Sequence, residues 1–158
     1  VENLHLVLVG SGENESDLIH PDTLTEIQEN PRIHSLGFQT DVAYFMKSCD
    51  FICLPSYREG FGSVIIEAAA CGIAAIGTNI PGLKDAIKHN ETGLLIAKKN
   101  MTELAEAILK MSTDLVFKKS VQTNAYDRAI LHFNHKLISN LQIKEYLNLT
   151  AETKNSNH

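Results

Sequence analysis

Short apolar runs alternate with segments of helical spacing from Leu4 to Met111, and this alternation limits the fold more than any other feature of the sequence. The apolar runs have the length of buried strands and lie at residues 4–9, 32–38, 50–55, 73–77 and 94–97. Strands that alternate with helices are typical of a parallel sheet covered by helices on both faces. The sequence therefore predicts an α/β fold with an open, doubly wound, Rossmann-like parallel sheet.

Helical patterns fill the intervals between these runs, at residues 16–30, 42–48, 63–72, 83–88 and 102–111. Pro21 interrupts the first pattern, because a proline inside a helix removes a backbone donor. Thr40 or Asp41 can cap the second helix and Thr102 the last one. Gly72 is expected to end the third helix, since glycine readily takes the left-handed conformation found there.

The pattern changes after residue 112, where helices alone are predicted. One covers residues 115–131, and another runs from Asn134, a favourable capping residue, to residue 149. The remaining residues are polar and small, which is typical of irregular chain ends. The expected organisation is a Rossmann-like domain over residues 1–112, helices that pack on it over residues 113–149, and a disordered or irregular tail over residues 150–158.

Charge and cysteine content exclude several classes of partner and site. The chain has 14 basic and 19 acidic residues, a formal net charge of −5, with both signs interspersed. We therefore expect no nucleic-acid partner.

Cys49, Cys53 and Cys71 lie in apolar surroundings, which predicts buried thiols in a reducing, cytoplasmic compartment. No apolar run reaches the ~20 residues that a membrane span needs, so the segment is expected to be soluble.

The stretch from Pro55 to Gly72 reads as a strand end, a turn and an Ala-rich helix, and it carries two carboxylates in unusual places. Glu59 lies in the turn and Glu67 interrupts the apolar helix. Glu67 has no Lys or Arg one helical turn away, so its charge lacks a local partner. A ligand could supply one, with hydroxyl donors for the carboxylate and a diphosphate for the free N–H groups at the helix start. The alternative of a solvated surface glutamate stays open.

Other candidate sites carry weaker signals. The turn Gly10-Ser11-Gly12 follows a strand, but Glu15 replaces the third glycine of a dinucleotide-binding motif, so a tight turn that lines a pocket at the sheet edge is favoured. Cys49 and Cys53 lack the further ligands that a metal site requires, and no Asp-x-Asp motif is present, which disfavours a metal-dependent transferase. Lysines are assigned to the solvated surface at positions 84, 88, 98 and 99.

The segment Glu59-Gly-Phe-Gly-Ser-Val-Ile-Ile-Glu67 resembles the signature of retaining GT-B glycosyltransferases of family 4, the glycosyl transferases group 1. The likeness extends from Leu4 to Met111. This whole segment is similar to the C-terminal, nucleotide-sugar-binding domain of that family. The further motifs follow in family order: Leu-Val-Leu-Val-Gly-Ser-Gly-Glu13, Leu-Gly-Phe38, Leu-Pro-Ser56, Glu-Ala-Ala-Ala-Cys-Gly72, Ile-Pro-Gly82 and Glu-Thr-Gly-Leu-Leu95.

The resemblance implies roles for individual residues. Glu67 would bind the ribose hydroxyls of the nucleotide, and Glu59, the candidate catalytic residue, would contact the donor hexose near the reacting carbon. The turn at Gly37 and Phe38 resembles the family's base-binding loop. The remaining candidate substrate-binding residues, which would line the site or offer backbone N–H groups to the sugar and diphosphate, are Gly10, Ser11, Gly12, Gly60, Phe61, Gly62, Ser63 and Val64.

The activity implied by the resemblance is transfer of a sugar from a nucleoside-diphosphate sugar, expected to be a UDP-sugar, to an acceptor hydroxyl. The reaction would retain the configuration at the anomeric carbon, use no metal or other cofactor, and serve surface polysaccharide or glycoconjugate synthesis. Two alternatives are a nucleotide-sugar epimerase and a non-catalytic nucleotide-sugar-binding module. A dinucleotide oxidoreductase is a weaker alternative that rests only on the turn at Gly10.

The sequence also departs from the family pattern. The strand and helix that precede the position of Leu4 in the family, and that carry an Arg and a Lys for the diphosphate, are not found, nor is the N-terminal acceptor-binding domain. Without the acceptor-binding domain, we expect the chain to bind the donor but not to transfer the sugar. The missing strand would be central in the family's sheet, so we expect another polypeptide segment to take its place. Self-association through the apolar faces of the last helices is expected too. Membrane contact is expected only through the absent domain, at the inner face of the membrane.

Overall fold

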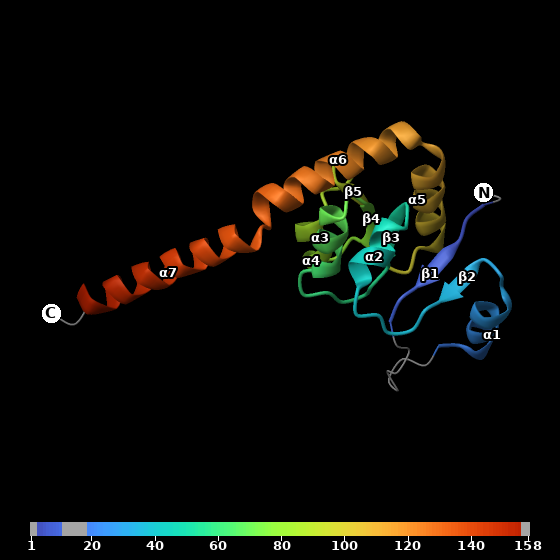
Figure 1. Cartoon of the computed structure of the whole chain (residues 1–158), viewed down its shortest axis with the longest axis horizontal. Coiled ribbons are helices and arrows are strands. Elements are labelled where there is room, and N and C mark those ends of the chain that lie inside the picture. The colour runs from blue at the N-terminus through green and yellow to red at the C-terminus, as the bar shows by residue number, and fades with distance from the viewer. Residues whose placement is uncertain (1–2, 11–18, 156–158) are drawn as a thin grey trace. The chain divides into compact units, whose positions relative to one another are not determined.

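The computed structural model of the chain describes residues 3–10 and 19–155 and divides the chain into two compact units, Val1–Phe45 and Met46–His158. Figure 1 shows the order of the elements along the chain, in colours from blue to red. The predicted division into a domain of residues 1–112 and helices of residues 113–149 that pack on it stays a prediction. The helix that begins at Leu115 packs against elements of the second unit, so it shares that unit's core.

The first unit contains a pair of short parallel strands and a helix. The strands β1 (Leu6–Leu8) and β2 (Ile33–Ser35) pair with Leu6 opposite Ile33. The helix α1 (Pro21–Glu29) begins at the proline that was expected to interrupt it. A proline at the first helical position loses no hydrogen bond, because that N–H has no partner within a helix. The side chain of His20 caps this helix by accepting from the backbone N–H of Asp22, at 3.3 Å.

The second unit contains a three-stranded parallel sheet, of order β3-β4-β5, and helices on both of its faces. The helix α2 (Val42–Lys47) spans the boundary between the units, and the side chain of Asp41 caps it, as predicted, by accepting from the N–H of Tyr44. The other elements are β3 (Phe51–Leu54), α3 (Ser63–Ala70), β4 (Ala74–Thr78), α4 (Pro81–Ala86), β5 (Gly93–Ile96), α5 (Met101–Thr113), α6 (Leu115–His132) and α7 (His135–Asn155).

The central strand β4 organises the core of the second unit, and every one of its side chains is buried. Ala74 and Ile76 pack on one face, in a cluster with Met111 of α5 and residues of α6. Ala75 packs on the opposite face, in a cluster with Leu83 of α4 and residues of α3. Successive side chains of a strand point to opposite faces, so this division shows that helices cover both faces of the sheet. The predicted α/β fold with parallel strands is confirmed.

The strands nevertheless form two small sheets rather than one. The first holds β1 and β2, and the second holds β3, β4 and β5. Within the described residues no strand pairing joins the two sheets. The resemblance to the family implied a missing strand that would be central in the family's sheet. The prediction that another polypeptide segment occupies that place stays a prediction.

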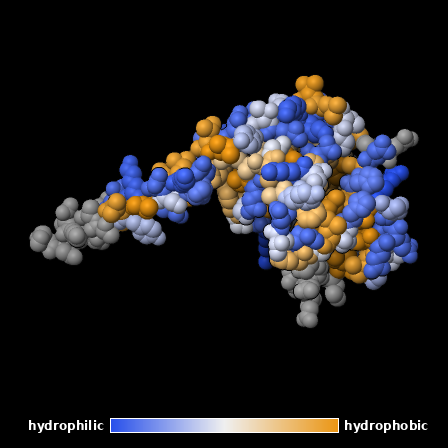
Figure 2. Space-filling model, in the orientation of Figure 1, coloured by the Kyte–Doolittle hydropathy of each residue, from blue (hydrophilic) through white to orange (hydrophobic). Residues whose placement is uncertain are grey.

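The C-terminal helices differ in their packing. Asp114 caps α6 by accepting from the N–H of Phe117 at 2.9 Å, and α6 buries one face through Val121, Ala125 and Ala129. Asn134 caps α7, as predicted, by accepting from the N–H of Lys136. Every side chain from residue 135 to residue 149 of α7 is exposed, and hydrophobic and hydrophilic residues are mixed along this part of the helix (Figure 2).

The helix α7 continues to Asn155, where the sequence predicted an irregular tail from Thr150. The segment from Asn134 to Asn155 contains no glycine or proline to stop the helix, and alanine, glutamate and lysine favour continuation. Residues 156–158 of the predicted tail lie outside the described part of the chain. None of the helices in the described residues combines the length and the apolarity needed to cross a lipid bilayer.

Two further helix ends test the predicted caps. Gly72 follows the end of α3 with a φ of 81°, the left-handed conformation expected there. The cap of α5, however, is Asn100 and not Thr102. The side chain of Asn100 accepts from the N–H of Glu103, and the Glu103 carboxylate accepts from the N–H of Ala97 and from the side chain of Asn100. This reciprocal pairing satisfies more free donors than Thr102 could, which explains the earlier start.

Candidate functional site

The loop from Pro55 to Gly62 connects β3 to α3 at the carboxyl edge of the three-stranded sheet. The buried hydroxyl of Thr78, at the end of β4, donates to the carbonyl oxygen of Ser56 at 2.6 Å. The Ser56 hydroxyl donates in turn to the carbonyl oxygen of Arg58, at 3.0 Å. The first hydrogen bond attaches the loop to the end of β4, and the second lies within the loop. In parallel sheets this edge is where ligands bind, and it carries Glu59 here.

Two glycines allow this loop and the start of α4 to lie in direct contact. Gly62 is buried with a φ of 70°, and a Cβ atom added to it would lie 2.5 Å from Cδ2 of Leu83. A Cβ atom added to Gly82 would overlap the carbonyl oxygens of Glu59 and Gly60. A side chain at either position would therefore force the loop and α4 apart. The absence of a side chain at both positions is therefore what permits the close packing of the loop on α4.

The helix α3 begins directly after this loop and leaves backbone donors free. Gly62 is its N-cap and contributes no side chain, while the N–H of Ile65 bonds the carbonyl oxygen of Gly62. The N–H groups of the first turn have no partner within a helix, and the helix dipole makes this end partially positive. Ser63 is exposed and Val64 is half-buried. The start of α3 thus combines N–H groups that have no partner within the helix with glycine backbone before it, an arrangement suited to an anionic ligand.

The two glutamates occupy different surroundings. Glu59 is half-buried and lines a hollow of ≈ 400 Å³ beside the loop. Glu67 is exposed on the outer face of α3, as are Ser63 and Ala70, and its carboxylate forms no ion pair among the described residues. The argument that Glu67 needs a ligand to offset the cost of burying its charge is therefore wrong, because water solvates this carboxylate in the free protein. The side chain remains accessible to a ligand.

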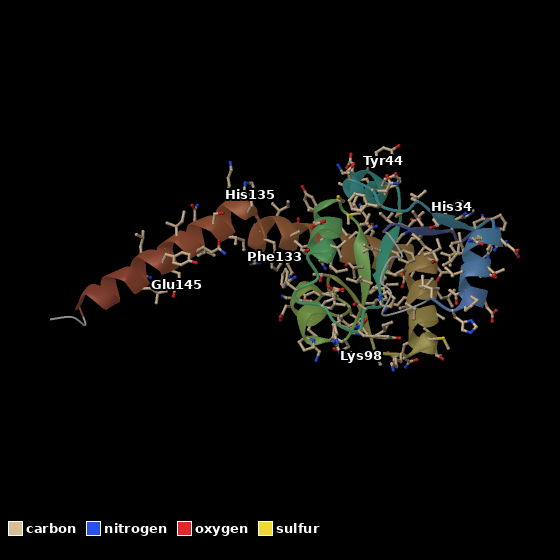
Figure 3. The ribbon with its side chains drawn as sticks, turned by 90° about the horizontal axis from the view of Figure 1, so that it is seen from below. His34, Tyr44, Lys98, Phe133, His135 and Glu145 are labelled. Atoms are coloured by element: carbon tan, nitrogen blue, oxygen red, sulfur yellow. The ribbon has the colours of Figure 1, made fainter. Side chains whose placement is uncertain are left out.

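The hollow beside Glu59 also contains residues that the sequence analysis did not assign to a site. Lys98, which follows β5 and is labelled in Figure 3, lines it, and Arg58 brings a second positive charge. The other lining residues are Tyr57, Gly60, Ile80 and Pro81. The ammonium group of the neighbouring Lys99 lies 5.7 Å from the ring centre of Tyr57. Lys98 could have been suspected because it directly follows a strand at the sheet edge that carries Glu59.

The candidate residues of the first unit gather at the ends of its two strands. The N–H of Gly10 donates to the carbonyl oxygen of Gly37 at 2.9 Å, and both glycines have positive φ values, 136° and 64°. Phe38 follows directly, with 74% of its surface exposed. Gly10, Gly37 and Phe38 thus lie together at the carboxyl edge of β1 and β2. Ser11 and Gly12, the remaining predicted residues of this turn, lie outside the described residues.

The cysteines are free thiols and are half-buried. Burial raises the pKa of the Cys53 thiol to about 11, so this thiol is protonated at neutral pH. Burial also raises the pKa of Cys49, and the nearby charge of Asp50 adds to this effect. Over residues 3–10 and 19–155, no three His, Cys, Asp or Glu side chains are grouped so that they could hold a metal ion. That the reaction needs no metal stays a prediction.

Comparison with known protein sequences identifies the family of the chain. The sequence profile of the family Glycosyl transferases group 1 matches residues 1–128. The chain is 30% identical over 136 residues to the capsular polysaccharide biosynthesis glycosyltransferase CapM of Staphylococcus aureus. It is 31% identical over 121 residues to N,N'-diacetylbacillosaminyl-diphospho-undecaprenol alpha-1,3-N-acetylgalactosaminyltransferase of Campylobacter jejuni. These matches cover 86% and 77% of this chain but only 36% and 32% of the relatives.

A comparison with solved structures gives the same result for the fold. The crystal structure of Anabaena Alr3699/HepE in complex with UDP-glucose matches 91% of this chain with a TM-score of 0.81 and 29% sequence identity. The match covers 40% of the HepE chain, so the 158 residues correspond to less than half of that protein. The profile match extends over most of the chain, and the relatives found by sequence and by structure agree with it. The chain therefore belongs to the glycosyl transferases group 1 family, which has the GT-B fold.

Proposed function

We propose that this chain is the nucleotide-sugar-binding part of a retaining glycosyltransferase of family 4 that uses no metal or other cofactor. It corresponds to the C-terminal domain of the family, and its donor is a UDP-sugar. The complete protein transfers the sugar to an acceptor hydroxyl during polysaccharide or glycoconjugate synthesis. The observation that carries this proposal is the start of α3, where Glu59 and Glu67 flank free N–H groups on bare glycine backbone.

The three parts of a UDP-sugar match three features of this site. The diphosphate accepts hydrogen bonds from the N–H groups of Gly62, Ser63 and Val64, and the helix dipole stabilises its charge. The Glu67 carboxylate accepts from the two ribose hydroxyls, and its exposure leaves it available for them. The hexose contacts Glu59 and the backbone of Gly60 and Phe61, beside a hollow whose volume of ≈ 400 Å³ lies within the usual range of ligand pockets.

The remaining residues that the resemblance assigns to the donor complete this proposal. The exposed ring of Phe38 and the backbone of Gly37 hold the nucleotide base, and the turn at Gly10, Ser11 and Gly12 lines the site. An aromatic ring with a free face offers a stacking surface to any base, so these contacts support binding without identifying the base. The UDP and UDP-glucose complexes of HepE favour uridine among the nucleotides.

The acceptor is bound by a part of the protein outside these 158 residues. The relatives are much longer than the matched segment, which leaves room for such a part. Catalysis of sugar transfer requires that donor and acceptor be held together in a reactive orientation. The 158-residue chain alone should therefore bind the donor but transfer no sugar at a measurable rate.

A thermal-shift experiment tests the proposal directly. UDP and UDP-sugars should raise the melting temperature of the chain, because a ligand that binds only the folded state stabilises it. GDP and GDP-sugars serve as probes of base selectivity, and NAD tests the oxidoreductase alternative. Stabilisation by NAD alone would contradict the proposal. Stabilisation by UDP-sugars without transfer, even when the complete protein is assayed, would favour a non-catalytic binding module.

A substitution of Glu59 separates the sugar contact from the nucleotide contact. Glu59→Ala should leave the dissociation constant for UDP unchanged and weaken the binding of UDP-sugars, since Glu59 is assigned to the hexose. Isothermal titration calorimetry with both ligands measures the difference. An equal loss of affinity for UDP and for UDP-sugars would contradict the role assigned to Glu59.

A further inference from the structure

The ring of Phe61 projects from the loop before α3 and packs on an aromatic side chain from a distant part of the sequence. Its ring centre lies 5.4 Å from that of Phe133, with an angle of 50° between the ring planes. Attractive aromatic pairs have ring centres roughly 4.5–7 Å apart, so this contact is a favourable one. Phe133 lies between α6 and α7 (Figure 3). The loop that carries Glu59 is thus held by a residue at the junction of the last two helices.

Arg128 of α6 fixes the position of Phe133. Its guanidinium carbon lies 4.8 Å from the centre of the Phe133 ring, and the guanidinium is therefore in cation–π contact with it. The same group donates to the carbonyl oxygens of Ala86 and Asp85, at 2.8 and 2.7 Å. Burial lowers the pKa of Arg128, and the charges of Glu91 and Asp85 act in the opposite direction. The planar guanidinium thus binds a helix end and an aromatic face at the same time.

The helix end that Arg128 binds is the carboxyl end of α4, whose last carbonyl groups have no partner within the helix. The other end of α4 is in contact with the loop itself, because Gly82 lies against the carbonyl oxygens of Glu59 and Gly60. Each group in this set therefore contacts the next. The loop packs on α4, α4 accepts hydrogen bonds from Arg128, Arg128 contacts the ring of Phe133, and Phe133 contacts Phe61 in the loop.

We propose that Phe133 is a positioning residue that fixes the conformation of the loop Gly60-Phe61-Gly62 through its contact with Phe61. This inference rests on the proposed function for its consequence, which is that Phe133 holds the loop N–H groups in place for a UDP-sugar without touching the ligand. Loss of the Phe133 ring removes the aromatic contact of the loop and leaves the packing against α4 intact. The junction of α6 and α7 thereby becomes part of the donor site's supporting structure.

A first experiment reads the loop directly by amide NMR of the ligand-free chain. Phe133→Ala should shift or broaden the resonances of Gly60, Phe61, Gly62 and Ser63. Tyr146→Ala is the matched control, because it removes an aromatic ring that is 71% exposed on α7 and should leave these resonances in place. Unchanged loop resonances in a folded Phe133→Ala chain would overturn the inference, whatever the chain binds.

A second experiment measures binding. Phe133→Ala should weaken the affinity for UDP-glucose roughly two- to tenfold, as expected for the loss of one aromatic contact, and Tyr146→Ala should not. Arg128→Lys keeps the charge but loses the planar fork, and should produce a smaller shift of the same loop resonances. If the wild-type chain binds no UDP-sugar, the proposed function fails, while the NMR experiment still decides whether Phe133 fixes the loop.

A third variant covers the case in which Phe133→Ala fails to fold. The chain contains no tryptophan, so Phe133→Trp keeps an aromatic ring and introduces a single fluorescent indole at the contact. We expect wild-type loop resonances, near wild-type affinity for UDP-glucose, and an indole emission in the ligand-free chain that differs from that of a fully solvated tryptophan. The emission of a fully solvated tryptophan in the folded, ligand-free chain would overturn the inference, since the ring at position 133 would then not contact the loop.

Discussion

The two compact units differ sharply in how much they bury. In the second unit, the buried residues form continuous clusters on both faces of the three-stranded sheet. Among the described residues of the first unit, none is buried, and large apolar side chains such as Leu6 and Leu24 are 46% and 43% exposed. An element of structure this small cannot build a hydrophobic core alone. Among the described residues, the buried hydrophobic core therefore belongs to the second unit.

Core substitutions should produce the largest difference between the units. Ile76→Ala removes a fully buried side chain from the centre of the second unit and should lower the free energy of unfolding by about 2–5 kcal/mol. Leu24→Ala, in the half-exposed helix α1 of the first unit, should lower it by less than about 1 kcal/mol. Urea denaturation measures the first effect, and native-state hydrogen exchange of α1 measures the second. Similar losses at both positions would show that the first unit shares a core that the exposure values do not reveal.

Glycine substitutions compare the loops of the two units. Gly62→Ala places a methyl group in a left-handed conformation and against Leu83, which should cost about 2–4 kcal/mol. Gly37→Ala causes the same backbone strain, at a φ of 64°, but a Cβ atom added there would have no neighbouring atom within 4 Å. The expected loss in the free energy of unfolding is therefore about 1 kcal/mol. The unfolding midpoints in urea measure both. A cost at Gly37 that equals the cost at Gly62 would mean that the space beside Gly37 is filled in solution.

Ligand binding tests whether both units contribute to one site. Glu67→Ala should weaken UDP binding about tenfold or more, because it removes a charged acceptor for two hydroxyls. Phe38→Ala in the first unit should weaken UDP binding by a smaller factor, since the stacking contact of one face is lost. Calorimetric titration with UDP compares the two variants. If Phe38→Ala has no effect while Glu67→Ala does, the donor site belongs to the second unit alone.

The smallest expected effect is a loss of stability at high pH that depends on the Cys53 thiol in the second unit. The pKa of Cys53 is raised from 9.0 to about 11 in the folded chain, so the folded state favours the protonated thiol. The corresponding stabilisation is complete below pH 9 and is lost as the pH rises toward 11. Relative to Cys53→Ala, the wild-type chain should lose about 1–2 kcal/mol of stability over this interval. Cys71→Ala controls for the removal of a thiol as such, and parallel pH profiles of wild type and Cys53→Ala would contradict the prediction.

Local features of the sequence predicted local structure well. The capping residues Asp41 and Asn134 and the left-handed Gly72 were identified because each acts within a few residues of its own position. Asn100 was missed as a cap although Glu103, three residues later, gives it the local spacing of a reciprocal cap. The alternation of strands and helices predicted the fold class, since the period of an apolar pattern does not depend on distant residues.

Long-range features of the site could not be predicted from the sequence. The exposure of Glu67 depends on which face of α3 meets α6 and the sheet, and the sequence pattern alone left that face open. Lys98 reaches the hollow beside Glu59 only because the loops after β3 and β5 end at one sheet edge. The contact of Phe133 with Phe61 joins residues from two different elements, and no local pattern marks either of them as a partner.

The tight packing between the loop and α4 also determines which positions tolerate change. Gly62 and Gly82 admit no side chain, since any added atom meets Leu83 or the loop backbone. Gly60 belongs to the same loop as Gly62, yet an added Cβ atom there would have no atom within 4 Å. Position 60 is therefore the one place in the glycine-rich loop where a library of side chains can be introduced without moving the scaffold, which makes it the natural starting point for altering the donor preference of the site.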